Sequence, residues 1–113
     1  IPQSLQKLAN LADKDGDPER AVTIAREAID AWIRLYDEDH LQVALVKNEL
    51  AGYLRNCGRH AESIEVAEEA LPVLQKHNPA YAIQAKRSVA INLDRLGEDQ
   101  RALNMLEEIY QDR

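Results

Sequence analysis

Apolar residues recur along this chain at steps of three and four, the spacing that places side chains on one face of an α-helix. The clearest stripe comprises Ala21, Ile24, Ala25, Ala28, Ile29, Trp32, Ile33 and Tyr36. Strict alternation of apolar and polar residues, which is typical of a half-buried strand, does not extend over five or more residues anywhere. The pattern therefore predicts an all-α protein.

Glycines mark the ends of these helices. Gly16, Gly58 and Gly97 each follow one helical stretch and precede another, as a helix-ending residue with positive φ does. Asp17-Pro18 and Asn78-Pro79 have the form of a capping residue followed by proline at the first helical position. The predicted helices span residues 3–15, 18–36, 41–57, 60–77, 79–96 and 99–112.

Aligning the chain on these glycines, which are 42 and 39 residues apart, reveals an internal repeat. An alanine stands seven positions before each glycine, at Ala9, Ala51 and Ala90. Small residues at matching offsets let two antiparallel helices approach closely, so that each pair buries its other face against the next pair. We expect a single domain over residues 1–113, with repeats of approximately residues 2–40, 41–78 and 79–113.

The middle repeat carries the most specific pattern. Its defining residues are Asp39-His40-Leu41-Gln42-Val43-Ala44, Asn48, Leu50-Ala51, Leu54, Gly58-Arg59, Glu62 and Ala70-Leu71. This pattern resembles the tetratricopeptide repeat (TPR), in the longer form found in kinesin light chains. The resemblance implies a right-handed α-α superhelix, a TPR-like solenoid of three helix pairs whose first helices line a concave groove. It also implies that the protein is a scaffold for protein or peptide binding and not an enzyme.

The distribution of charge narrows the range of partners. The chain has 20 acidic residues against 14 Lys and Arg, a net charge of −6, which disfavours binding to nucleic acid. The predicted first helices nevertheless hold seven basic and four acidic residues, a net charge of +3, which leaves −9 for the rest. A basic groove in an acidic protein would steer an acidic segment towards it. Alternatively, this partition of charge arises by chance in a small sample. Not every charge on the first helices need face the groove, and Lys14, Arg55 and Arg95 lie at helix C-termini, which favour cations.

The family pattern predicts which side chains face the groove. Amides there can pair with the backbone of an extended ligand, and arginines can bind carboxylates through two parallel hydrogen bonds. The candidate groove residues are Gln6, Asn10, Asn48, Arg55, Arg87, Ile91 and Arg95. One TPR subclass grips a free C-terminal carboxylate with Lys, Asn and Arg. The matching positions here hold Gln6, Asn10, Glu49, Gln84 and Ser88, so we do not expect that specificity.

The last predicted helix suggests a second type of contact. It carries four large apolar residues, Leu103, Leu106, Ile109 and Tyr110. Nothing follows this helix to cover one of its sides, whereas solenoids normally end in a polar cap. We therefore expect either a longer parent protein, of which this chain is a fragment, or a homo-oligomer formed through this helix. The alternative function is self-association, or a regulatory role within a larger signalling protein.

No motif indicates catalysis, a metal site or a cofactor. The segment Asp13-Lys14-Asp15-Gly16-Asp17 lacks the ligand spacing of a calcium loop, and the three histidines are too dispersed for a helical metal pair. A single cysteine, Cys57, cannot form an internal disulfide, which favours the cytoplasm. No apolar run approaches the roughly 20 residues that span a bilayer, so no membrane partner is expected.

Overall fold

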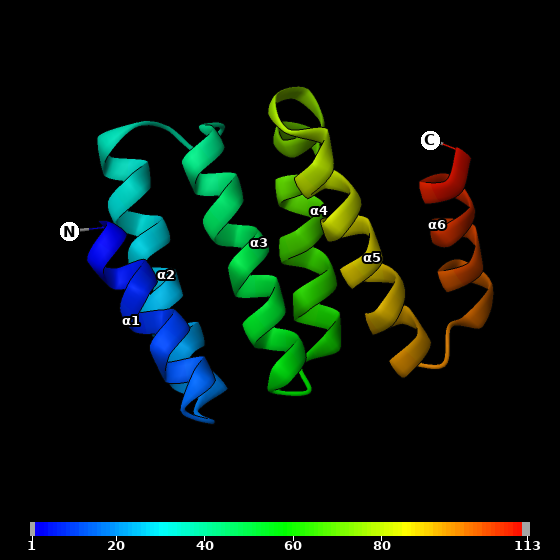
Figure 1. Ribbon diagram of the computed structural model, residues 1–113, viewed down its shortest axis with the longest axis horizontal. Coiled ribbons are helices and arrows are strands. Elements are labelled where there is room, and N and C mark those ends of the chain that lie inside the picture. Colours follow the sequence, from blue (N-terminus) through cyan, green and yellow to red (C-terminus); the bar gives the residue numbers. More distant parts are fainter. Residues whose placement is uncertain (1, 112–113) are drawn as a thin grey trace.

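Six α-helices follow one another from one end of the molecule to the other, with the N- and C-termini at opposite ends (Figure 1). The computed structural model describes residues 2–111, with side chains through Ile109, and contains no strand in that range. The helices are α1 (Pro2–Lys14), α2 (Pro18–Leu35), α3 (Leu41–Asn56), α4 (His60–His77), α5 (Pro79–Arg95) and α6 (Asp99–Gln111). Each predicted helix end within residues 2–111 lies within one residue of the observed one, and the predicted end of the last helix, at residue 112, lies outside the described residues.

The turns inside the three helix pairs share one hydrogen-bond pattern. Gly16, Gly58 and Gly97 have φ values of 85°, 79° and 81°, which confirms their predicted role. In the second pair, the N–H of Gly58 donates to the carbonyl of Arg55 at 3.0 Å, and the N–H of Arg59 donates to Leu54 at 2.9 Å. The same bonds recur around the other two glycines. The glycines therefore define equivalent positions in the three pairs.

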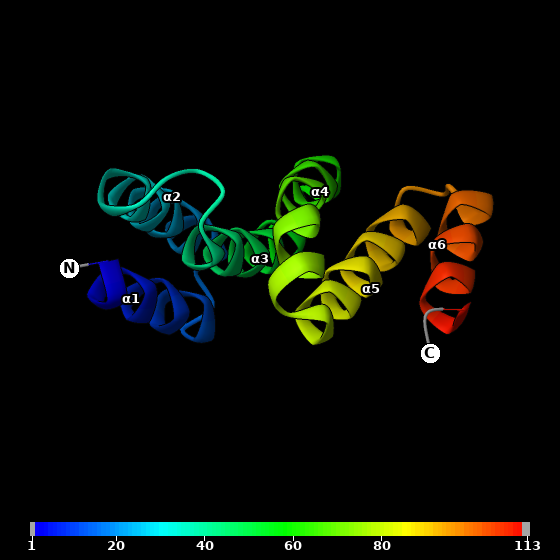
Figure 2. The same ribbon diagram turned by 90° about the horizontal axis from the view of Figure 1, so that it is seen from above.

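The helix pairs form a slab of 40 × 31 × 17 Å. Seen from above, α2 and α4 lie on the same side of α3 and flank it (Figure 2). The alanine seven positions before each glycine is buried in all three pairs, at Ala9, Ala51 and Ala90. Apolar residues of consecutive pairs interlock around these alanines, and one cluster joins Ala51 and Ile64 to Val89 of the next pair. Each pair therefore provides part of its neighbour's core.

One cluster of polar side chains lies inside this core, between α3, α4 and α5. The Nδ2 group of Asn92, which is fully buried, donates to Ser63 Oγ and to the Ser88 carbonyl, each at 2.9 Å. Ser63 Oγ donates to the Ala51 carbonyl at 2.6 Å. Because a carbonyl only accepts, the Asn92 amide orientation is fixed, and its oxygen faces Nδ1 of His60 at 2.7 Å. The His60 Nδ1 atom therefore carries a hydrogen.

The two junctions between helix pairs differ in length. Tyr36–His40 connects α2 to α3, whereas Asn78 alone connects α4 to α5. The longer junction is ordered by the Tyr36 ring, which stacks on His40 at 3.9 Å between ring centroids and on Trp32 at 5.6 Å. His40 Nδ1 also accepts from the N–H of Gln42 at 3.1 Å and caps α3. The unequal glycine spacing of 42 and 39 residues arises mainly at these junctions.

Candidate functional site

A hollow of about 240 Å³ lies between the first helices of the second and third pairs, α3 and α5. It is lined by Asn48, Gly52, Arg55, Gln84, Arg87, Ser88 and Ile91. We call this surface the α3/α5 hollow. It brings together four of the predicted groove residues, Asn48, Arg55, Arg87 and Ile91. The sequence analysis named Gln84 and Ser88 only as positions that match the carboxylate-binding subclass. Gln84 stands three positions before Arg87 and Ser88 three before Ile91, and this helical spacing would have placed both in the groove.

The α3/α5 hollow is basic. Arg55 and Arg87 are its charged lining residues, and none of the residues lining it is acidic. Arg55 Nη1 donates to Ser88 Oγ at 3.4 Å across the hollow, and no described carboxylate forms an ion pair with either arginine. Space for a Cβ atom at Gly52 is open, so a ligand backbone can approach α3 closely there. The arrangement offers two guanidinium groups and several uncharged donors to a carboxylate-bearing segment.

Two predicted groove residues on α1 lie elsewhere. Gln6 Oε1 accepts a hydrogen bond from Trp32 Nε1 at 2.9 Å, and its side chain also bonds to the Glu49 carboxylate. Gln6 therefore ties α1 to α2 and α3. Asn10 is exposed on α1 and does not line the α3/α5 hollow.

The region between α1 and α3 is not basic. Burial, together with the negative charges of Glu49 and Asp13, raises the pKa of Tyr53 to about 12. Asp13 Oδ1 accepts a hydrogen bond from Asn56 Nδ2 at 2.9 Å. The surface formed by the first helices is therefore acidic between α1 and α3 and basic between α3 and α5.

Two lysines in the basic count of the first helices point away from the α3/α5 hollow. Lys47 Nζ forms an ion pair with Glu69 on α4 at 3.2 Å, and Lys86 is buried. Both stand eleven positions before a glycine, so both occupy the same side of their helices. The net charge of these helices therefore overstates the positive charge that a ligand in the hollow would meet.

A second hollow of about 700 Å³ lies between α5 and α6. We call it the α5/α6 hollow, and it is lined by Arg87, Ala90, Ile91, Asp94, Arg95, Asp99, Ala102, Leu103 and Leu106. Arg95 lines this hollow and not the α3/α5 hollow, so it does not join Arg55 at one site. Its neighbours Asp94 and Asp99 balance the positive charge there.

The apolar residues predicted as one face of the last helix are divided by the structure. Leu103 and Leu106 are 54% and 38% exposed and line the α5/α6 hollow. Ile109 is 2% exposed, so the expectation that it lies on an open face was wrong. It stands seven residues, about two helical turns, after buried Ala102 and shares that inward face. The side chain of Tyr110 lies outside the described residues.

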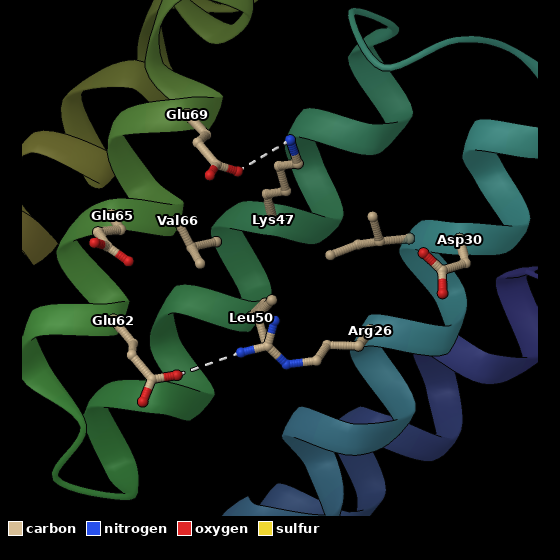
Figure 3. Close-up of a pocket in the computed structure, with 9 residues that line it drawn as sticks. Arg26, Asp30, Lys47, Leu50, Glu62, Glu65, Val66 and Glu69 are labelled. Atoms are coloured by element: carbon tan, nitrogen blue, oxygen red, sulfur yellow. Dashed lines mark hydrogen bonds and ion pairs between the residues drawn. The ribbon is translucent and has the colours of Figure 1, made fainter.

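A third hollow, of about 360 Å³, lies between α2 and α4 with α3 as its floor (Figure 3). Its carboxylates are Asp30, Glu62, Glu65 and Glu69. Arg26 pairs with Glu62 at 3.4 Å, and Lys47 pairs with Glu69, so the cations of this hollow are already engaged. In the described part of the chain, no group of three or more His, Cys, Asp or Glu residues could hold a metal ion.

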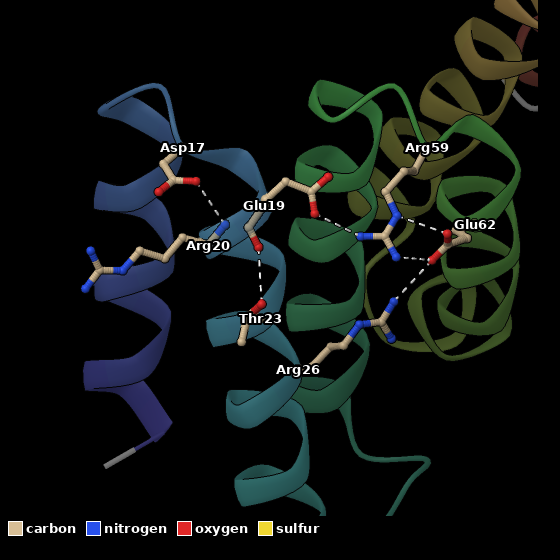
Figure 4. Close-up of polar contacts among 7 residues, drawn as sticks. All are labelled: Asp17, Glu19, Arg20, Thr23, Arg26, Arg59 and Glu62. Carbon is tan, nitrogen blue, oxygen red and sulfur yellow. Dashed lines mark hydrogen bonds and ion pairs between the residues drawn. The ribbon is translucent and has the colours of Figure 1, made fainter.

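Glu62 links α2 to α4 beside this third hollow (Figure 4). Its carboxylate accepts from Arg59 Nε at 3.0 Å and Nη2 at 2.7 Å, and from Arg26 on α2 at 3.4 Å. The hydrogen bonds from Arg59 lower the pKa of Glu62, although desolvation opposes the shift. Arg59 also reaches Glu19 at 3.3 Å. These contacts stabilise the packing of consecutive pairs.

Cys57 lies at the end of α3 near the same cluster. Burial raises the pKa of its thiol, and a hydrogen bond with the Glu19 carboxylate raises it further. The thiolate form needed for nucleophilic or metal-binding chemistry is therefore disfavoured.

A family model for the tetratricopeptide repeat matches residues 2–76. The chain belongs to the tetratricopeptide repeat family. This confirms the resemblance and the predicted solenoid of three helix pairs. TPR repeats are in general protein–protein interaction modules. None of the TPR helices in the described range is long and apolar enough to cross a membrane.

Solved TPR structures share this fold. The TPR domain of Arabidopsis FLU superposes with a TM-score of 0.84 at 18% identity, covering 98% of this chain and 92% of that one. A Podosopora anserina chain, named for kinesin-light-chain TPR-like repeats, gives a TM-score of 0.80 at 20% identity. That match covers 96% of this chain, which spans only 55% of the Podosopora chain. No curated protein sequence matches this chain.

Proposed function

We propose that this chain is a non-catalytic interaction module that binds an acidic, extended segment of a partner protein in the α3/α5 hollow. The observation that carries the proposal is the position of Arg55 and Arg87. They project from adjacent helices into one hollow that no carboxylate lines. Because neither forms an ion pair with a described residue, a ligand carboxylate would not have to displace an internal carboxylate.

Several modest contacts would have to act together. An exposed ion pair contributes only about 0–1 kcal/mol, so the two arginines alone would not hold a ligand. Asn48 and Gln84 add amide groups that can pair with a ligand backbone, and Ile91 adds exposed apolar surface. The preferred ligand therefore combines carboxylates with apolar side chains.

The remaining charges favour a protein partner over nucleic acid. The chain has a net charge of −6, and carboxylates gather around the third hollow between α2 and α4. A phosphate backbone would be repelled by these groups. The partner segment can be expected in the cytoplasm, because a reducing environment suits the free thiol of Cys57.

Selection from a phage-displayed library of random peptides tests the proposal. We expect enrichment of peptides that carry Asp or Glu beside Leu, Ile or Phe. Arg87→Glu should weaken the selected peptides by roughly tenfold, or about 1.4 kcal/mol, because it replaces an attraction with a repulsion.

Arg34→Glu is the matched control, since it makes the same charge change at an exposed position on α2. It should leave the affinity unchanged within error, and circular dichroism should show the same helix content in both variants. Selection of peptides without acidic residues, or equal binding by the Arg87→Glu variant, would contradict the proposal.

A further inference from the structure

The repeat positions show which face of each first helix is covered by the preceding pair. The residues eight and five positions before the glycine are buried in α3 and α5, namely Leu50, Tyr53, Val89 and Asn92. In α1 the equivalent residues are Leu8 and Leu11, which are 52% and 57% exposed. The face of α1 that would pack on a preceding pair is therefore open.

The opposite end of the stack shows the complementary surface. The residues six and nine positions after the glycine are buried in α2 and α4, namely Val22, Ala25, Ile64 and Ala67. In α6 the equivalent residues are the exposed Leu103 and Leu106, which line the α5/α6 hollow. This hollow is the third pair's equivalent of two covered surfaces. The first pair's surface is covered by α3, and the second pair's surface is covered by α5.

We propose that two copies of this chain associate head to tail, with α1 of one copy packed in the α5/α6 hollow of the other. The contact would repeat the packing of α3 on α1 and α2. Leu8 and Leu11 of the second copy would then meet Leu103 and Leu106 of the first. The two open faces lie at opposite ends of the molecule, so one chain cannot close them on itself (Figure 1).

Charges at two sets of equivalent positions favour this arrangement, whereas the internal Gln6–Glu49 contact has two cations, Arg87 and Lys7, as its equivalents. Inside the chain, Asn56 on α3 donates to Asp13 on α1, at 2.9 Å. The residue equivalent to Asn56 in a docked α1 is Lys14, and the residue equivalent to Asp13 in α5 is Asp94. In the docked arrangement Lys14 would therefore face Asp94. The internal interface has the amide of Asn56 facing Asp13 at the same place.

The second helices show the same relationship. Arg26 on α2 pairs with Glu62 on α4 at 3.4 Å across the first internal interface. At the junction between copies, the equivalent residues are Glu107 on α6 and Arg20 on α2 of the second copy. Here the carboxylate lies on the first copy and the arginine on the second, the reverse of the internal pair, so the two side chains still attract each other.

The proposed contact joins two different surfaces and therefore leaves one of each free at the ends of every assembly. It predicts open-ended growth with protein concentration. Pairing through two copies of α6 would instead stop at a dimer. This difference makes the two modes separable by experiment.

Sedimentation velocity of two complementary variants tests the proposal. Leu8→Glu/Leu11→Glu disables the α1 face, and Leu103→Glu/Leu106→Glu disables the α5/α6 hollow. We expect the unmodified chain to grow beyond a dimer as concentration rises, and each variant alone to remain a monomer. An equimolar mixture should form a dimer and nothing larger, because only one pair of intact faces remains. Formation of that dimer also shows that both variants are folded.

A control variant, Gln75→Glu/Lys76→Gln, makes the same change in net charge at exposed positions on α4, which belongs to neither of the two proposed faces, and should associate like the unmodified chain. Three results would overturn the proposal. The unmodified chain could stay monomeric at every concentration, the α1 variant could dimerise by itself, or the mixture could remain monomeric.

Discussion

The amide oxygen of Asn92 on α5 lies 2.7 Å from Nδ1 of His60 at the start of α4, while its amide nitrogen reaches Ser63 one turn further along. No buried side-chain polar atom among the described residues lacks a partner. Asn92→Ala would leave the Nδ1 hydrogen of His60 unsatisfied and remove a donor from Ser63. We expect a loss of about 1–3 kcal/mol in the free energy of unfolding, measured by urea denaturation. Asn104→Ala, at an exposed position on α6, should change it by no more than roughly 0.5 kcal/mol.

Two glycines with open space around them should respond to alanine in opposite directions. Gly58 has a φ of 79°, so Gly58→Ala should cost about 1–2 kcal/mol although no atom lies within 4 Å of the new Cβ. Gly52 lies inside α3, where Gly52→Ala should stabilise the protein by roughly 0.5–1 kcal/mol. Urea denaturation of both variants measures these changes. Equal effects would mean that backbone conformation is not what distinguishes the two positions.

Leucines at equivalent positions of α1 and α3 should differ sharply in their contribution to stability. Leu50 is 2% exposed, and Leu50→Ala should cost about 2–5 kcal/mol because it leaves a cavity between two helix pairs. Leu8 is exposed, and Leu8→Ala should change the free energy of unfolding by less than roughly 0.5 kcal/mol. The comparison is made by chemical denaturation at low protein concentration, where association is absent. A large loss for Leu8→Ala would show that this face is already packed in the monomer.

The Glu49 carboxylate should destabilise the folded protein at neutral pH. Burial raises its pKa, and the hydrogen bond with Gln6 only partly opposes this. The stability contributed by the protonated carboxyl is therefore present in acid and lost as pH rises through the folded-state pKa. Glu49→Gln should raise the melting temperature at neutral pH, and the gain should vanish below the ordinary pKa of glutamate. A gain that persists unchanged in acid would rule out this cause.

Glu62 should show the opposite dependence on pH. Hydrogen bonds from Arg59 lower its pKa, so its contribution to stability is present above the ordinary glutamate pKa and lost as pH falls through the folded-state value. Glu62→Gln should lower the melting temperature at neutral pH and match the unmodified chain in strong acid. Melting curves across the acid range measure the difference. Identical melting temperatures at neutral pH would show that the contacts with Arg59 and Arg26 contribute nothing.

The sequence predicted the helices and their repeat closely, because their signals are local. Each glycine that ends a helix also determines the conformation of the turn after it. The end of α3 and the start of α4 could therefore be located from Gly58 alone. The alanines at the matching positions, Ala9, Ala51 and Ala90, correctly predicted close packing of the helices, because a small residue there lets two helices approach each other.

The surface was harder to predict because it depends on where each side chain points around its helix. Lys47 and Arg55 belong to the same helix, yet one pairs with α4 and the other lines the α3/α5 hollow. Ile109 was expected on an open face because nothing follows the last helix to cover one of its sides, although its position on the helix turns it towards the core. The hydrogen bonds of Asn92 were not predicted, since a polar residue at a core position gives no sign of its partners.

The difference in length between the two junctions indicates where residues can be inserted into this chain or removed from it. Tyr36–His40 and Asn78 differ in length, yet the same turn and the same alanine contact recur on both sides of them. Residues can therefore be inserted or removed between α2 and α3 without shifting the side chains that meet across the helix pairs. We expect tolerance of sequence-length variation to be concentrated in that one connector, which makes it the natural place to graft a tag or a foreign loop.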